Sequence, residues 1–230
     1  MPKRKVVSLV SGGMDSCTTM AKLAIEDWEV YPLYINYGQT AFPKEIESAK
    51  NYIKVLQERF KNLYNLEIVE ISLPFLKVSL TGATSVTKET DEDFHTMESK
   101  KIDWVPARNI IFLTVASSYC ELLKSRNISI GSYKEDEMPS YPDSSREFFD
   151  ALEVALTKGM YGDKFNIITP FIDSFKWGMV KYSKENKLPI ELTWSCYEAS
   201  NEHCGLCRNC IDREKAFKKA GVVDPTKYKE

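Results

Sequence analysis

Residues 5–16 decide the fold of this chain, and they read Lys5-Val6-Val7-Ser8-Leu9-Val10-Ser11-Gly12-Gly13-Met14-Asp15-Ser16. The first six residues are rich in valine and leucine and predict a short β-strand, which Ser11-Gly12-Gly13 ends. A helical pattern begins near Asp15. The stretch therefore predicts a strand, a glycine loop and a helix, in that order.

The remainder of the chain repeats this alternation. Further strands are expected at residues 30–37, 66–73, 128–131 and 167–168, and helices at 46–60, 107–124 and 144–158. The helix over 107–124 is apolar along its length, so we expect it to be largely buried. Strands that alternate with helices imply a parallel sheet covered by helices on both faces. We therefore predict an α/β, Rossmann-like fold, interrupted by a long polar surface loop at 80–103.

Composition limits the class of protein. The chain has 230 residues, 43% apolar and 28% charged, which is typical of one soluble globular domain. It carries 31 Lys+Arg against 33 Asp+Glu, so we expect no nucleic acid as its main partner. No apolar stretch approaches the ~20 residues of a membrane span, and no secretory signal is recognisable. We expect a cytoplasmic protein with no membrane partner.

The glycine loop lies where a parallel sheet places its ligands, after a strand and before a helix. Gly12 and Gly13 let backbone amides face a ligand, Ser11 and Ser16 add hydroxyl groups, and the helix dipole favours an anion such as phosphate. A bare Ser-Gly-Gly is also a common turn, so the loop alone leaves both interpretations open. The spacing matches neither the Walker loop nor the G-x-G-x-x-G dinucleotide fingerprint.

Four of the six cysteines lie close together near the C-terminus. Cys196, Cys204, Cys207 and Cys210 have the spacing C-x7-C-x2-C-x2-C, which suits one tetrahedral metal ion. Zinc fits best, and with all four positions filled by protein it is expected to be structural; two disulfides or an iron-sulfur cluster are the alternatives. His203 is expected to be an unligated surface residue. We divide the chain into an α/β domain, 1–190, and a zinc-binding segment, 191–230.

The glycine loop resembles the SGGxDS signature of the PP-loop ATP pyrophosphatases, with Met14 in the variable place. Together with the cysteines, the chain from Val6 to Phe217 resembles the QueC family, the 7-cyano-7-deazaguanine synthases of queuosine biosynthesis. The supporting segments are Tyr37-Gly38-Gln39, Val105-Pro106-Ala107-Arg108-Asn109, Tyr141-Pro142-Asp143, Thr169-Pro170, Lys176, Thr193-Trp194-Ser195-Cys196-Tyr197 and Cys204-Gly205-Leu206-Cys207.

The resemblance implies a reaction and a set of site residues. ATP would be cleaved between its α and β phosphates to adenylate the carboxylate of 7-carboxy-7-deazaguanine, ammonia would displace AMP to give an amide, and a second ATP would dehydrate the amide to the nitrile. Carried over by position, Asp15 would hold Mg²⁺ and act in catalysis with Arg108 and Lys176. The residues implied to bind ATP are Ser11, Gly12, Gly13, Met14, Ser16, Gln39 and Asn109, and those implied to bind the substrate are Tyr141 and Asp143. Without the resemblance, Arg108 is more simply a surface charge at the start of a helix.

The chain departs from the family pattern near the expected substrate end. Thr40-Ala41 stand where the family has Arg-His, and Ser144-Ser145 where it usually has Cys-Arg. These changes suggest retained adenylation with an altered acceptor. The alternative function is therefore conjugation of the deazaguanine to a protein amine, as in QueC-like proteins of antiviral CBASS systems. Another PP-loop amidation or thiolation, or a zinc-stabilised nucleotide-binding protein without turnover, also stays open. We expect a homodimer.

Overall fold

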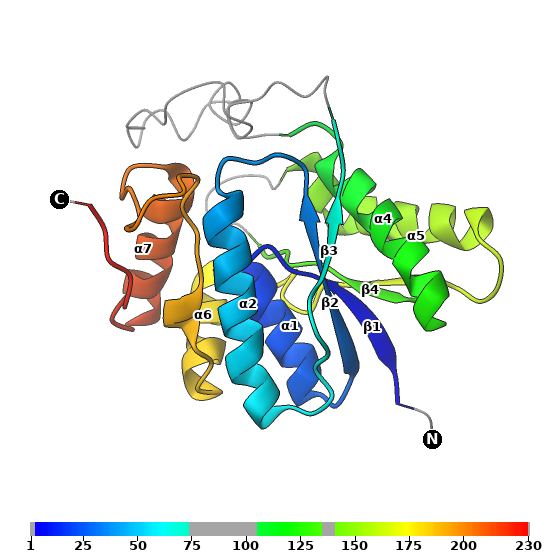
Figure 1. Cartoon of the computed structure of the whole chain (residues 1–230), viewed down its shortest axis with the longest axis horizontal. Helices are drawn as coiled ribbons and strands as arrows, with labels where there is room; N and C mark the ends of the chain where they lie inside the picture. Colours follow the sequence, from blue (N-terminus) through cyan, green and yellow to red (C-terminus); the bar gives the residue numbers. More distant parts are fainter. Residues whose placement is uncertain (1–2, 74–104, 135–140, 230) are drawn as a thin grey trace.

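The computed structural model describes residues 3–73, 105–134 and 141–229, so the loop expected at 80–103 lies outside the described residues. Its sheet has five strands, β1 (Lys5–Leu9), β2 (Glu29–Asn36), β3 (Glu67–Glu70), β4 (Asn127–Ser129) and β5 (Asn166–Ile168). They lie in the order β3-β2-β1-β4-β5, and every pairing is parallel. The predicted parallel sheet is confirmed (Figure 1).

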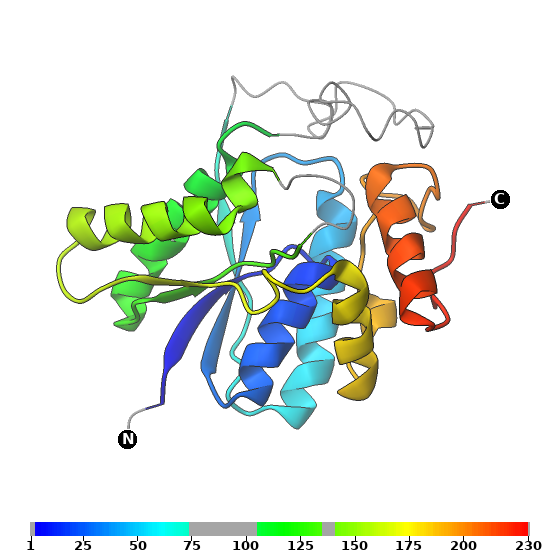
Figure 2. The same ribbon diagram turned by 180° about the vertical axis from the view of Figure 1, so that it is seen from behind.

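Helices cover both faces of this sheet (Figures 1 and 2). One face is covered by α1 (Met14–Ile25), α2 (Phe42–Arg59) and α6 (Lys176–Glu185), and the other by α4 (Arg108–Leu123) and α5 (Arg146–Gly159). The last helix, α7 (Arg208–Ala220), packs against α6 at the outside of the first layer. The short 3-10 turns η3 (Pro142–Ser144) and η4 (Ile190–Leu192) complete the described elements. The α/β, Rossmann-like prediction is confirmed.

The central strand β1 explains why residues 5–10 are almost continuously apolar. Val6 and Val10 belong to the core beneath α1 and α2, whereas Val7 and Leu9 belong to the core beneath α4 and α5. All four side chains are buried. Because a strand covered on both faces needs apolar residues at odd and even positions alike, the sequence shows a run and not an alternation.

Helix α4 is less buried than its sequence predicts. Leu113, Ala116 and Cys120 are fully buried against the sheet, but Ile110 is 41% exposed and Leu122 is 79% exposed. A helix lying on a sheet turns only one side toward it. The expectation of a largely buried helix at 107–124 was therefore wrong for its outer side.

The C-terminal part contains α6 and α7, two helices that the sequence analysis did not predict. Their apolar side chains Val180, Ala216 and Phe217 form a small core with Met14 of α1. Arg213 of α7 is fully buried, and its guanidinium donates hydrogen bonds to the side chains of Thr193, Ser195 and Thr226 and to the carbonyl of Ile190. These contacts fasten α7 to the chain segment that precedes the cysteine cluster.

Among the helices that the structure describes, none combines the length and the apolar character needed to cross a bilayer.

Candidate active site

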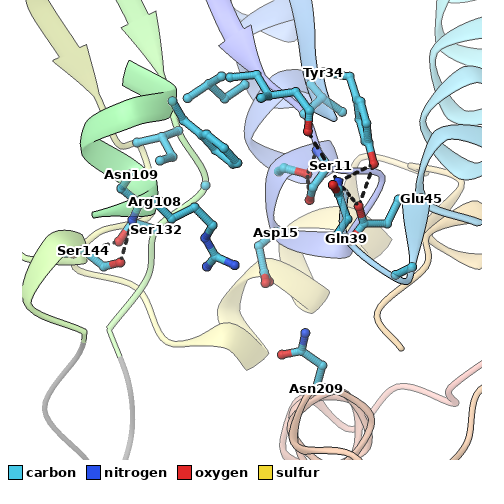
Figure 3. A pocket seen from close by; sticks show the side chains of 18 of the residues that line it. Ser11, Asp15, Tyr34, Gln39, Glu45, Arg108, Asn109, Ser132, Ser144 and Asn209 are labelled. Atoms are coloured by element: carbon cyan, nitrogen blue, oxygen red, sulfur yellow. Dashed lines mark hydrogen bonds between the residues drawn. The ribbon is translucent and has the colours of Figure 1, made fainter. Parts of the chain in front are cut away.

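A cavity of about 290 Å³ opens at the carboxyl ends of β1, β2 and β4 (Figure 3). This is close to the lower end of the ~300–1,000 Å³ usual for ligand pockets. Of the site residues predicted from the sequence, it is lined by Ser11, Asp15, Ser16, Gln39, Arg108, Asn109 and Tyr141. Residues from nearly the whole length of the chain thus meet at the edge of the sheet where this fold class binds ligands.

Gly12 has a conformation and surroundings that only glycine tolerates. Its φ is +78°, and a Cβ added there would collide with the backbone carbonyl oxygen of Glu45 in α2. The Gly12 carbonyl accepts hydrogen bonds from the Ser48 hydroxyl at 2.7 Å and from the Trp194 backbone N–H at 2.9 Å. The glycine loop is therefore held from both α2 and the segment before the cysteine cluster.

The serines of the loop bond to each other. The Ser11 backbone N–H donates to the Ser16 hydroxyl at 3.0 Å, and the two hydroxyl oxygens are 3.1 Å apart. Gly13 precedes α1 and offers no side chain to cap it. The start of α1 is thus suited to an anion. The Met14 side chain is 1% exposed and packs in the small core with α6 and α7, which leaves only its backbone for a ligand.

Asp15 and Lys176 form an ion pair beside the cavity. The Lys176 Nζ lies 3.2 Å from Asp15 Oδ2, and the lysine side chain is only 11% exposed. Burial acts to lower the pKa of Lys176, but the charge of Asp15, with smaller contributions from Tyr133 and Asp212, raises it above the usual value. The other carboxylate oxygen, Asp15 Oδ1, is buried and has no hydrogen-bond partner in the described part of the chain. Such an oxygen is free to bind a cation or a donor.

Arg108 begins α4 and points toward Asp15 across the cavity (Figure 3). Burial acts to lower its pKa, but its interaction and hydrogen bond with Tyr37 raise it, so the guanidinium stays charged. The preceding residue, Ala107, has the left-handed φ of +57°. The structure thus places Arg108 in the cavity and not on the open surface.

Asn109 and Asp143 bind each other. The Asn109 side-chain amide donates to the backbone carbonyl of Asp143 at 2.7 Å and to the Ser144 hydroxyl at 3.0 Å, and its backbone N–H donates to the Asp143 carboxylate at 3.2 Å. These bonds tie the start of α4 to η3. Asn109 lines the cavity, whereas Asp143 lies behind it and is absent from its lining.

Gln39 belongs to a buried hydrogen-bond network. Its side-chain amide donates to the Tyr34 hydroxyl at 2.7 Å and to the Glu45 carboxylate at 3.0 Å, while Tyr34 donates to the same Glu45 oxygen at 2.7 Å (Figure 3). Burial raises the pKa of Glu45, against the effect of these two donors. The network fixes the loop that follows β2 beside the cavity.

The positions that depart from the family pattern have defined contacts. The Thr40 hydroxyl donates to the backbone carbonyl of Tyr197 at 3.1 Å, and Ala41 is buried at the start of α2. Ser144 and Ser145 differ in their contacts. Ser144 lines the cavity, and the Ser145 hydroxyl caps α5 by accepting from the Phe148 N–H at 3.1 Å.

Helix α7 contributes to the cavity, which the sequence did not predict. Arg208, Asn209 and Asp212 line it, together with Tyr197. Arg208 Nε lies 3.6 Å from Asp212 Oδ2, and the Arg208 guanidinium donates to the Tyr141 hydroxyl at 3.4 Å. The paired apolar residues Ala216-Phe217 and the following Gly221 were the available signals for a helix here. Without the fold, nothing indicated which side of that helix faces the cavity.

The four cysteines form one buried cluster. Their sulfur atoms all lie within 4.8 Å of one another, and no cysteine is more than 6% exposed. Backbone N–H groups donate to the Cys196 and Cys204 sulfurs at 3.3–3.4 Å, which favours thiolates. With Zn–S bonds of about 2.3 Å, a tetrahedral site needs sulfurs about 3.8 Å apart, so this donor set is compatible with zinc.

His203 is buried, which corrects the expectation of a surface residue. It is 5% exposed, its ring lies 4.1 Å from that of Trp194, and its Nε2 accepts from the Ser195 backbone N–H at 3.0 Å. Burial lowers the pKa of His203 to about 4, which keeps the ring neutral and able to accept this bond. His203 is outside the set of metal-compatible ligands, which contains only cysteines among the described residues.

Comparison with known proteins agrees with the sequence motifs. The family described as "Queuosine biosynthesis protein QueC" matches residues 5–221. The chain is 36% identical to the 7-cyano-7-deazaguanine synthase of Methanobrevibacter smithii, with all of both chains covered. It is 35% identical to the one of Acetivibrio thermocellus, with 99% of each covered.

A solved structure supports the fold. The complex of a 4-thiouridine synthetase with RNA and bound ATP superposes with a TM-score of 0.50 at 15% identity, covering 95% of this chain and 50% of that one. At this identity the likeness concerns the fold alone. The family match over nearly the whole chain goes further: this protein belongs to the QueC family.

Proposed function

We propose that this protein makes 7-cyano-7-deazaguanine, the product that the names of its relatives give, and that it does so from 7-carboxy-7-deazaguanine with ATP and ammonia. An oxygen of the substrate carboxylate attacks the α-phosphorus of ATP, and the bond to pyrophosphate breaks. Ammonia then attacks the acyl carbon, AMP leaves with that oxygen, and a proton is lost to give the amide. A second adenylation, on the amide oxygen, is followed by loss of AMP and two N–H protons to give the nitrile.

The observation that carries the proposal is the convergence of Ser11, Asp15, Ser16 and Arg108 on one cavity at the start of α1. Pyrophosphate leaving from ATP carries negative charge, which the open amides of α1 and a charged guanidinium stabilise. Lys176 supplies a second buried cation next to Asp15. We assign the phosphate end of the site to these residues, with the backbone of Gly12, Gly13 and Met14.

The residues at the phosphate end also fit Mg²⁺. Asp15 is the candidate ligand, because its Oδ1 is buried without a partner in the described chain and carboxylate oxygen is a ligand that Mg²⁺ prefers. When bound, Mg²⁺ supplies charge compensation for the phosphates. Lys176 holds the other Asp15 oxygen and so orients the carboxylate.

We assign two different roles to the other predicted site residues, which are Gln39, Asn109, Tyr141 and Asp143. Tyr141 lines the cavity and is a candidate substrate contact. Asn109 and Asp143 bond to each other, and Gln39 bonds to Tyr34 and Glu45. We therefore assign these three mainly to positioning the cavity walls, although Asn109 and Gln39 also line it.

The proposal extends to the zinc segment and the whole protein. We propose that the four cysteines hold one structural zinc ion, that the segment 191–230 packs on an ATP-binding domain formed by 1–190, and that the protein works in the cytoplasm as a homodimer. Metal analysis tests the zinc, limited proteolysis the division of the chain, light scattering the dimer, and cell fractionation the location.

The test is to incubate the purified protein with ATP, MgCl₂, 7-carboxy-7-deazaguanine and ammonium, and to identify the products by mass. We expect the nitrile, with the amide as a transient intermediate. An unchanged acid would contradict the proposal, and an accumulated amide would limit it to the first adenylation. Adding proteins encoded beside this one tests for a larger amine as acceptor.

A further inference from the structure

The first turns of α7 place polar side chains on the cavity across from the phosphate end. Asn209 points into the cavity opposite Asp15 (Figure 3). Asp212 follows three residues later and also lines the cavity. Residues three apart in a helix share one side, so these two side chains form a single polar surface of the site.

The position of this surface is set by the cysteine cluster. Cys207 is the N-cap residue of α7, and Cys210 lies within its first turn. The sulfurs of these two cysteines are 3.4 Å apart, and Asn209 lies between them in the sequence. Arg213, fully buried, bonds the same helix to Thr193 and Ser195. A surface held this firmly can discriminate between ligands, because its groups cannot shift to suit a different molecule.

Of the carboxylates that line the cavity in the described chain, Asp212 is the one suited to a substrate. Asp15 pairs with Lys176 at 3.2 Å, and Glu45 accepts from both Tyr34 and Gln39. Asp212 has a looser ion pair, 3.6 Å from Arg208, which also contacts Tyr141. Its side chain is 30% exposed.

The lining also suits a planar ring with hydrogen-bond donors. The cavity is lined by Tyr133, Tyr141 and Tyr197, and aromatic side chains favour contact with a planar ring. A guanine-like base presents a ring N–H and an exocyclic amine side by side, and one carboxylate can accept from both. An adjacent carboxamide can donate to the carbonyl oxygen of the same edge.

We infer that Asn209 and Asp212 are specificity-determining residues that bind the guanine-like edge of the carboxylate substrate, Asp212 accepting from its ring N–H and exocyclic amine and Asn209 donating to its carbonyl oxygen. This inference rests on the proposed function and adds two residues and a recognition mode to it. It makes the zinc segment a part of the substrate site as well as a support for the fold.

The experiment compares 7-carboxy-7-deazaguanine with its analogue that lacks the exocyclic amine, in substrate-dependent exchange between ATP and pyrophosphate. For the wild type, kcat/KM should be about 100-fold lower with the analogue, because a site that binds an N–H group rejects molecules without it. Asp212→Asn should lower kcat/KM for the natural acid about 100-fold and reduce the discrimination below about 10-fold. Its KM for ATP should stay within about twofold. Asn209→Ala should lower kcat/KM for both acids alike.

Matched controls separate recognition from folding. Glu214→Gln removes the same charge from the exposed side of α7, and Asn201→Ala removes an exposed carboxamide from the same segment, so both should behave as wild type. Zinc content and KM for ATP report whether each variant is folded. Should Asp212→Asn lose zinc, Asn209→Ala carries the test alone.

Two failures are distinguishable. If the wild type catalyses acid-dependent exchange and both variants keep wild-type kcat/KM and discrimination, the inference is overturned and the proposed function stands. If the wild type shows no acid-dependent exchange, the proposed function fails and the inference fails with it.

Discussion

At the scale of single residues, Asp15 has the clearest functional signature. Its buried carboxylate oxygen Oδ1 has no partner in the described chain, which is costly unless a bound ion, a ligand or a water supplies one. Its second oxygen is bound to Lys176, a buried cation at the N-terminus of α6. A lysine there opposes the helix dipole, so stability alone does not account for its position.

Asp15→Asn should lower kcat roughly 100- to 1,000-fold, because it removes the charge that we assign to the phosphate end of the site and to the binding of Mg²⁺. It should also cost about 1–3 kcal/mol of stability, since Lys176 loses its charged partner. Steady-state kinetics and thermal unfolding measure the two effects. Asp150→Asn, at an exposed position of α5, is the matched control. Wild-type kcat in Asp15→Asn would reduce Asp15 to a residue at the start of a helix.

Ala107 is the second residue with a specific prediction. Its φ of +57° costs a residue with a Cβ about 1–2 kcal/mol, whereas glycine adopts it freely but loses more entropy on folding. Ala107→Gly should therefore raise stability by about 0.5–1 kcal/mol, measured by denaturant unfolding. Ala151→Gly, within α5, should instead lower it by about 1 kcal/mol. A loss of stability in Ala107→Gly would show that the turn is unstrained.

At the scale of elements, the sequence predicted the parallel sheet and most of its covering helices, but not which helix sides are buried. The β1–α1 unit and the helix at 46–60 were recognisable because strand and helix periods differ and each is strong there. The exposed side of α4 was not recognisable, since an apolar helix has the same sequence pattern whether one side or all sides are covered. Helix α7 was not predicted because its polar start overlaps the cysteine motif. His203 was expected on the surface because its burial depends on Trp194 and Tyr228, which pack on it only in the folded chain.

The contact between the end of β4 and the start of α1 is an element-scale feature with a direct test. A Cβ on Gly131 would lie 2.9 Å from the Ser16 backbone nitrogen and 3.0 Å from the Asp15 carbonyl carbon. Gly131→Ala should push α1 away, cost about 1–3 kcal/mol and raise KM for ATP several-fold. Gly159→Ala, where the added Cβ meets nothing within 4 Å, should leave KM for ATP unchanged and should not lower stability, because alanine is the better helix former at the end of α5. If the two variants had the same stability and the same KM for ATP, the close packing at Gly131 would be contradicted.

At the scale of the whole molecule, the cysteine cluster and the glycine loop are linked. The segment before the cluster bonds to the loop through the Trp194 N–H and the Gly12 carbonyl, and α7 contributes to the cavity. The cluster was predictable from spacing alone. The connection of the cluster to the glycine loop was not predictable, because the hydrogen bond joins Gly12 to Trp194, which lie far apart in the sequence.

Zinc removal should therefore affect both stability and ATP use. Cys207→Ser should lower zinc content below one per chain, lower the midpoint of thermal unfolding, and raise KM for ATP, because α7 and Trp194 lose their support. Cys120→Ser, far from the cluster in α4, is the control for loss of a buried thiol. If zinc leaves while KM for ATP and stability stay unchanged, the cluster has no such coupling.

If a substrate carboxylate attacks the α-phosphorus of ATP, as we propose, an oxygen atom moves from the substrate to AMP. The protein is supplied with ATP, MgCl₂, ammonium and 7-carboxy-7-deazaguanine labelled with ¹⁸O in both carboxylate oxygens, and the nucleotide products are examined by mass spectrometry. We expect unlabelled pyrophosphate and AMP that carries one ¹⁸O, with two such AMP molecules for each nitrile formed. Unlabelled AMP, or ADP formed in proportion to product, would contradict the proposed attack.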